Sequence, residues 1–272
     1  MSYRNRHARV NVKLLVILLL VVVALGTALA AARQIRRSIL TKVSLTAGET
    51  AFANKDWPAA YSNLREYLGY NPNNTEILKK CAKARLSMRP LEPEALRWAI
   101  GAYRLVLQHN PLDEVSYEQL ARLYSGTANF TELAYIANTR LAHVPGDRRA
   151  QLWLADALVQ QNKSEEARQT LERLITGLES VPDKRVEYVQ ACVRMSDIAS
   201  RDGSSGAKTA ALAWLNKAVE YDPTSMEALV SRARFYRQTA NVPGLTTSDR
   251  SALARKDLEA AGTLSTQDPN VR

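Results

Sequence analysis

The chain has 272 residues, 46% of them hydrophobic and 24% charged, which excludes bulk disorder and allows one large or two ordinary globular units. Only 7% are aromatic and only 11 are Gly, which favours an all-α fold because strands depend on aromatic and β-branched residues. The net charge is +10, but eight of the 37 Lys and Arg residues precede the first acidic residue, Glu49, and the other 29 face 27 Asp and Glu. A nearly neutral body lacks the basic surface that phosphate binding requires, so we expect no nucleic-acid partner.

The N-terminus carries a membrane signal. Residues 1–13 form a basic tail, and residues 14–32 are nineteen uncharged, mostly apolar residues. As a helix this segment would be about 28 Å long, close to the hydrocarbon thickness of a bilayer. It predicts a single-pass transmembrane anchor that contacts the lipid bilayer. Residues 33–42, which contain Arg33, Arg36, Arg37 and Lys42, then form a basic juxtamembrane linker.

A cleaved signal peptide is the competing interpretation of the same segment. Residues 14–25 would be its apolar core, Gly26 its break and residues 28–30 its small-residue cleavage site. The uninterrupted length and the cationic stretch that follows favour the anchor. Basic residues flank both ends, so the positive-inside rule finds little asymmetry. Because the basic tail is similar to the start of an export signal, we expect the rest of the chain on the extracytoplasmic side.

From residue 43 onward one helical pattern recurs. Prolines close apolar helical stretches at intervals of 34 to 46 residues, at Pro72, Pro111, Pro145, Pro182, Pro223 and Pro269. Before most of them, an Ala is followed by apolar residues four and seven positions later, which places all three on one helix face. The sets are Ala60-Leu64-Tyr67, Ala99-Tyr103-Val106, Ala167-Leu171-Leu174, Ala211-Leu215-Ala218 and Ala254-Leu258-Ala261.

Each of these helices is preceded by another with a small residue at its centre. The corresponding sets are Ala47-Gly48-Ala51, Leu120-Ala121-Tyr124, Leu154-Ala155-Leu158 and Ala233-Tyr236. A small residue lets two antiparallel helices approach closely, so each unit is predicted to be a helical hairpin. In the first unit, Asp56 caps the second helix, Pro58 lies in its first turn and Asn71-Pro72 ends it.

The phased hairpins resemble the tetratricopeptide repeat (TPR) family, whose pattern W-x2-L-G-x2-Y, A-x3-F, P spans 34 residues. The resemblance covers about six units over residues 43–272 and implies a right-handed αα-hairpin solenoid. Unit three departs from the pattern, with Leu133, Ala137 and Arg140 in its second helix, which questions the packing there. Turns in units two, five and six are lengthened by Pro, Gly and Ser, unlike the near-fixed register of RNA-reading repeats.

Signals for chemistry are sparse. The chain has no phosphate-binding loop, dinucleotide fingerprint, zinc-protease motif or nucleophile elbow, so we expect no enzyme activity, cofactor or metal. His109 and His143 each precede a helix-ending Pro, where they suit a helix C-terminus. Cys81 and Cys192 lie in Ala-rich helices and are expected to be buried free thiols rather than a disulfide. The four tryptophans, Trp57, Trp98, Trp153 and Trp214, indicate inter-helix core rather than an aromatic cage.

The TPR resemblance implies a peptide-binding groove lined by first helices. Carried over by position, the residue after each small seam residue faces the groove, and Arg237 lies one turn beyond the last. The candidates are Glu49, Lys83, Arg122, Asp156, Val193, Arg234 and Arg237. One TPR subgroup clamps a C-terminal carboxylate with an Asn, but Glu49 stands there and would repel it. The mixed signs imply no uniformly charged ligand.

Together these features predict a membrane-anchored TPR scaffold that binds a protein or peptide partner through a concave groove. One alternative is the N-terminal tethering or regulatory part of a longer envelope-associated enzyme or assembly factor. Another is a secreted, soluble TPR protein, which follows if residues 14–32 are a cleaved signal.

Overall fold

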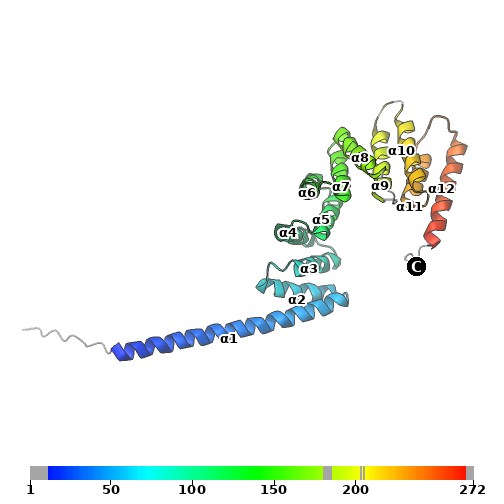
Figure 1. The fold of residues 1–272 in the computed structure, drawn as a ribbon. Helices are drawn as coiled ribbons and strands as arrows, with labels where there is room; N and C mark the ends of the chain where they lie inside the picture. Colours follow the sequence, from blue (N-terminus) through cyan, green and yellow to red (C-terminus); the bar gives the residue numbers. More distant parts are fainter. Residues whose placement is uncertain (1–11, 180–185, 203, 205, 268–272) are drawn as a thin grey trace, which may run out of the picture. The chain divides into compact units, whose positions relative to one another are not determined.

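The protein is all-helical. The computed structural model describes residues 12–179, 186–202, 204 and 206–267, and the side chains among them except those of residues 12–18, 21, 22 and 265–267. Within these residues there is no strand, and the helices in chain order (Figure 1) are α1 (Val12–Ala53), α2 (Trp57–Tyr70), α3 (Thr75–Ser87), α4 (Pro93–His109), α5 (Glu114–Gly126), α6 (Phe130–His143), α7 (Arg148–Gln160), α8 (Ser164–Glu179), α9 (Val186–Arg201), α10 (Ala207–Tyr221), α11 (Met226–Gln238) and α12 (Thr247–Gln267).

Helix α1 is 42 residues long and passes without a break through the predicted anchor, the predicted linker and the first helix of the first repeat (Figure 1). The predicted anchor falls partly on residues 14–18, 21 and 22, whose side chains lie outside the described set, as does the tail of residues 1–11. Among the residues that the structure describes, none of the helices combines the length and the apolar character that crossing a bilayer requires.

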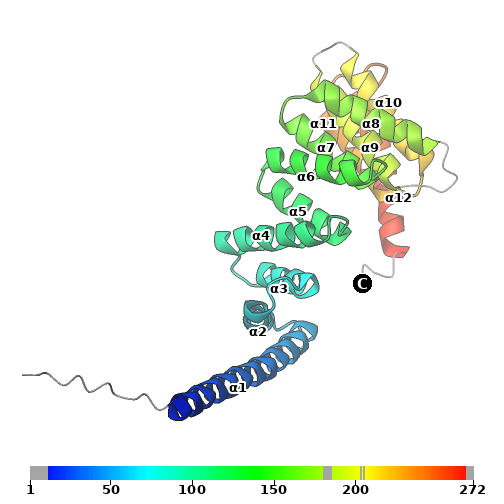
Figure 2. The ribbon, with the colours of Figure 1, turned by 60° about the vertical axis from the view of Figure 1, so that its left-hand side comes forward.

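The chain divides into two compact units, Met1–Asn110 and Pro111–Arg272. In the first unit, α2 packs on α1, α3 on α2 and α4 on α3. In the second unit each helix from α6 to α12 packs on the one before it, and α9 also contacts both α7 and α11 (Figure 2). The first helices α7, α9 and α11 therefore lie side by side, and the second helices α8 and α10 cover their other face.

Most of the predicted seam positions are buried in the core, but Ala47 in the first seam is exposed. The Ala-x3-large pattern is buried in the second helices α2, α4, α8 and α10, as are Gly48, Ala121, Ala155 and Ala233 on the facing first helices. Gly48 shows how close this packing is, because a Cβ added to it would lie 2.6 Å from Leu64 Cδ2 and 3.1 Å from the Leu64 backbone N. Pro182 and Pro269 lie outside the described residues.

The remaining prolines share one pattern of capping hydrogen bonds at the ends of their hairpins. The residue before Pro72, Pro111, Pro145 or Pro223 caps a second helix by donating its backbone N–H to the carbonyl four residues earlier, at 2.7–3.0 Å. Two residues after each proline, a polar side chain caps the next first helix by accepting a backbone N–H: Asn74, Asp113, Asp147 and Ser225. The predicted cap Asp56 is confirmed, since its carboxylate accepts the Ala59 N–H at 3.2 Å.

Turn lengths also follow the prediction. The turns after α1, α5 and α7 are short, and each holds one non-glycine residue with positive φ: Lys55, Ala128 and Asn162. The turns after α3, α9 and α11 are longer, which confirms the lengthening expected in units two, five and six.

The second helix of unit three is buried at its seam positions, and Arg140 has partners there that the sequence pattern does not reveal. Leu133 and Ala137 are fully buried, and Arg140 is nearly so. The Arg140 guanidinium donates to Asp147 Oδ2 at 2.6 Å and to the Leu112 carbonyl at 3.1 Å, and it lies 5.3 Å from the Tyr117 ring centroid. These contacts satisfy a cation that would otherwise be destabilising in a core.

Both cysteines are buried free thiols, as predicted. Cys81 lies in the first unit and Cys192 in the second. Burial raises the pKa of each thiol to about 12, with Arg65 opposing the rise at Cys81 and Lys217 at Cys192. The reactive thiolate is therefore scarce at neutral pH as long as each unit stays folded.

We expect Gly48→Ala to destabilise the first hairpin by about 1–3 kcal/mol, because the added methyl must displace Leu64. Gly69→Ala is the matched control, since a Cβ added there would meet no atom within 4 Å and α2 is helical at that position. It should be neutral or stabilise by about 0.5–1 kcal/mol. Thermal unfolding of both variants measures the difference, and equal effects would contradict the close approach at Gly48.

The alkylation rate of each thiol should report the opening of its own unit. At pH 8 iodoacetamide should alkylate both cysteines slowly in the folded protein and quickly in denaturant, because their folded pKa values are raised to about 12. In the Gly48→Ala variant, alkylation should accelerate at Cys81 and stay unchanged at Cys192. Peptide mass spectrometry resolves the two sites. Equal acceleration at both would show that the units open together.

Candidate functional site

The predicted groove residues were assigned to first helices, and the structure places each of them there. Glu49, Lys83, Arg122, Arg234 and Arg237 are exposed, and Asp156 is half-buried. In the first unit, Lys80 on α3 donates to Glu49 on α1 at 2.5 Å. The ammonium group of Lys83 lies 5.7 Å from the Phe52 ring centroid. Both groove candidates of this unit therefore contact neighbouring helices.

In the second unit, Asp156 on α7 is held by Arg194 on α9. The guanidinium donates from Nε at 2.7 Å and from an Nη nitrogen at 2.9 Å to the two carboxylate oxygens. This bidentate pair joins two adjacent first helices on their exposed side. Arg194 is not among the residues that the sequence pattern selects.

The prediction that Val193 faces the groove is wrong, because Val193 is half-buried against both core clusters of this unit. The groove position belongs to the next residue, Arg194. Arg194 follows Asp156 by 38 residues. The same 38 residues separate Arg148 and Val186, the first residues of α7 and α9, so Arg194 occupies on α9 the position that Asp156 occupies on α7. The rule that selects the residue after each small seam residue gives Val193, because it uses Cys192 as the small seam residue of α9.

More charged groups surround this pair. Desolvation raises the pKa of Asp197 on α9 above its ordinary value, and the positive charges of Arg201, Arg194 and Arg234 oppose the rise. The pKa of Arg194 is raised by its hydrogen bonds to Asp156 and by the charge of that carboxylate, against the effect of burial. The exposed face of α7, α9 and α11 thus carries acidic and basic groups that interact across helices.

Two adjoining cavities lie between α11 and α12. One, of about 350 Å³, is lined by Val230, Ala233, Arg234, Arg237, Gln238 and Leu258. The other, of about 420 Å³, is lined by Arg237, Ser251, Ala254, Arg255, Leu258 and Glu259. In the same hairpin, Arg232 donates to both carboxylate oxygens of the buried Asp257 at 2.8 Å and fastens α11 to α12. The cavities combine apolar side chains with arginines.

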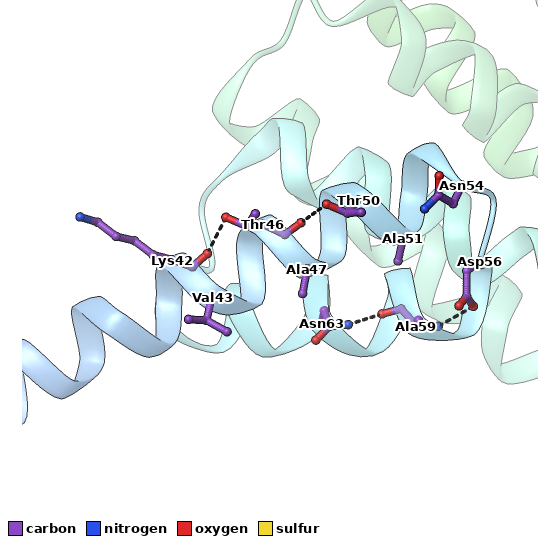
Figure 3. Close-up of a pocket in the computed structure, with 10 residues that line it drawn as sticks. All are labelled: Lys42, Val43, Thr46, Ala47, Thr50, Ala51, Asn54, Asp56, Ala59 and Asn63. Carbon is purple, nitrogen blue, oxygen red and sulfur yellow. Dashed lines mark hydrogen bonds between the residues drawn. The ribbon is translucent and has the colours of Figure 1, made fainter.

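A third cavity, of about 760 Å³, lies between the C-terminal part of α1 and α2. Figure 3 shows its lining, which includes the small side chains of Ala47, Ala51 and Ala59. Three of its polar side chains form local hydrogen bonds: Thr46 and Thr50 donate to carbonyls one turn earlier, and Asn63 donates to the Ala59 carbonyl at 2.8 Å (Figure 3). This surface therefore presents few groups that could select a polar ligand.

The aromatic residues and histidines serve packing and helix ends. Trp57 packs edge-on against Phe52 and Trp98 against Tyr61, both with ring centroids 5.6 Å apart. His109 and His143 lie in the last turns of α4 and α6, as predicted. In the described part of the chain no group of three or more His, Cys, Asp or Glu side chains is arranged to hold a metal ion.

Comparison with known proteins agrees with this geometry. A family model described as "Tetratricopeptide repeat" matches residues 135–176, which lie in α6, α7 and α8. A search of curated proteins finds no match. Among solved structures, a tetratricopeptide repeat protein from Parabacteroides merdae is 17% identical, with a TM-score of 0.60 over 82% of this chain and 79% of that one.

Two further structures are less similar. Yeast Tom70 is 16% identical with a TM-score of 0.48, covering 78% of this chain and 39% of its own. YrrB, described as a TPR protein with an unusual peptide-binding site, is 15% identical with a TM-score of 0.42, covering 75% of this chain and 93% of its own. On the strength of the Parabacteroides structure and the matched segment, the chain has the tetratricopeptide-repeat fold, with residues 135–176 matching the family's model.

Proposed function

We propose that this protein is a scaffold that binds a protein or peptide partner through the exposed face of its first helices. The observation that carries the proposal is the arrangement on α7, α9 and α11, where the Asp156–Arg194 pair, Asp197 and Arg234 converge. Packing alone does not require such a cluster, because the apolar seams already hold these helices together. Polar groups fixed on rigid helices are suited to selecting a partner.

The chemistry of this face favours a partner with both polar and acidic groups. The Asp156 and Arg194 side chains neutralise one another, so together they offer hydrogen bonds more than net charge. Arg122 on α5 and Arg237 on α11 are exposed, and neither has an ion pair within the described residues. Their guanidinium groups can donate to backbone carbonyls or to acidic side chains. An extended peptide would meet these donors in succession.

We propose further that residues 14–32 anchor the scaffold in a membrane. The support is the run of nineteen uncharged residues, and within it Leu19, Leu20, Val23, Leu25 and Leu29 are each more than half exposed. Apolar side chains so exposed on one helix need a nonpolar environment. The repeat units would then lie on the extracytoplasmic side, with the helical linker of residues 33–42 spanning about 15 Å beyond the bilayer.

The binding proposal predicts that changing Arg122, Arg234 and Arg237 together to Ala weakens partner capture several-fold without changing helicity or melting. Exposed charges contribute little to folding but can contribute to recognition. The control replaces three exposed cations on or beside the second helix α8, Lys163, Arg168 and Arg173, and removes the same charge. Crosslinking in intact membranes followed by mass spectrometry compares the recovered partners. Equal recovery by both variants at two salt concentrations would refute a role for these arginines.

The membrane proposal predicts that the protein sediments with membranes and stays there at alkaline pH in carbonate, because a buried apolar helix does not desorb. Replacing Leu19, Val23 and Leu29 by Asp should release it, while replacing the exposed Leu112 by Asp should not. The measured quantity is the fraction of protein in the pellet. A soluble protein whose N-terminus begins near residue 31 or 33 would instead identify a cleaved signal and a secreted scaffold.

A further inference from the structure

The surface between α11 and α12 is hollowed by the two adjoining cavities. We define the end groove by seven residues that line the two adjoining cavities: Val230, Ala233, Arg234 and Arg237 on α11, and Ala254, Arg255 and Leu258 on α12. Arg237 and Leu258 line both cavities, so the two form one continuous depression. Its lining combines four apolar residues with three arginines.

A comparison of equivalent positions in successive repeats shows what kind of ligand this groove can bind. Leu258 occupies the same position of the Ala-x3-Leu pattern as Leu171 and Leu215, which are 0% and 3% exposed, yet it is 39% exposed. The difference has a structural cause, because α9 packs on α7 and α8, and α11 packs on α9 and α10. In each of those hairpins the next first helix covers the equivalent surface. Among the described residues, no helix beyond their own hairpin covers α11 and α12 in this way, so the groove has the form of a helix-binding surface.

The charges of the end groove indicate what kind of helix could bind there. Arg237 and Arg255 form no hydrogen bond or ion pair with any described residue, whereas Arg232 in the same hairpin is consumed by Asp257. Glu259 is the single acidic residue among the lining residues of the two cavities. A helix placed here therefore meets positive charge around apolar side chains. Complementarity requires apolar residues along one stripe and carboxylates beside it.

We propose that the end groove binds an acidic amphipathic helix of a partner protein. This deepens the proposed scaffold function and rests on it. Leucine-like side chains of the partner, spaced three and four residues apart, would pack against Val230 and the exposed Leu258. Its Glu or Asp residues would accept hydrogen bonds from Arg237 and Arg255, which suit bidentate carboxylate binding better than lysine would. Because both arginines are exposed to solvent, binding weakens as the ionic strength rises.

The test uses the full chain in zwitterionic lipid nanodiscs, with empty nanodiscs as background. The probe is a fluorescent synthetic helix of about 18 residues, long enough to hold helical structure, with Leu on one face and Glu on both flanks. A second peptide carries Lys in place of Glu, and a third carries the same residues with the Leu stripe scrambled. Fluorescence anisotropy gives the affinity, and a photoreactive group on the peptide maps the contact.

Three variants locate the site. Arg255→Glu and Leu258→Ser should each weaken the acidic peptide about tenfold, since one reverses a groove charge and the other removes the exposed apolar contact. Lys256→Glu is the matched control, because it changes charge by the same amount on the neighbouring exposed residue, which lines neither cavity. It should change the affinity less than about twofold. Circular dichroism and melting confirm that all three variants are folded.

Photo-labelling should fall on α11 and α12, and the lysine and scrambled peptides should bind at least about tenfold more weakly. The proposal is overturned if the lysine peptide binds as tightly, if Lys256→Glu weakens binding as much as Arg255→Glu, or if no peptide binds. Labelling of α7 and α9 instead would reject the end groove while leaving the proposed scaffold function standing. Normal binding of the acidic peptide by the Arg122, Arg234 and Arg237 variant would also overturn the end groove, because that variant lacks two of its three arginines. Loss of partner capture by the same variant would still leave the proposed scaffold function standing.

Discussion

The packing of this protein depends on burying apolar surface that a single helical hairpin cannot bury alone. A hairpin buries its own seam, as between Gly48 and Leu64, but within each compact unit the next first helix covers its other apolar face, as α3 covers α2 and α9 covers α8. Stability in such a fold is a sum of neighbouring contacts rather than the property of one central core. The requirement explains why small residues recur at the seams, and it explains why the last described hairpin leaves Leu258 exposed while Leu215 in the hairpin before it is buried.

Features that follow from periodicity were predictable from the sequence. The Ala-x3-large sets and the closing prolines locate the hairpins, because burial and helix termination act on residues that are close in the chain. The capping role of Asp56 was also predictable, because it depends on one side chain and one helical turn. The same reasoning failed at Val193, because the residue after a buried small residue, here Cys192, does not always face away from the core. A count from helix start to helix start finds Arg194.

Features that depend on distant pairing were not predictable. Arg194 and Arg232 look like exposed cations in the sequence, and Arg140 looks like a misfit at a seam position. Each is paired with an aspartate, which lies 38, 25 or 7 residues away. Arg140 makes a nominally degenerate helix pack well, and Arg232 fastens α11 to α12. Periodicity does not distinguish the paired Arg194 and Arg232 from Arg237 and Arg255, because all four occupy polar helix positions. Only the folded structure shows which of these arginines are paired within the described part of the protein and which are not.

Helix α1 links the predicted membrane segment to the repeat fold more directly than a flexible linker would. The sequence divides it into an anchor, a basic linker and a first repeat helix, yet the backbone is helical throughout. Arg37, in the predicted linker, donates to the Tyr70 carbonyl at the end of α2 at 2.7 Å and lies 5.6 Å from the Tyr70 ring centroid. Through this contact, the packing of α2 on α1 extends into the linker. A scaffold anchored through this helix would therefore hold its first hairpin at a defined distance from the bilayer, because neither a glycine nor a proline interrupts residues 33–47.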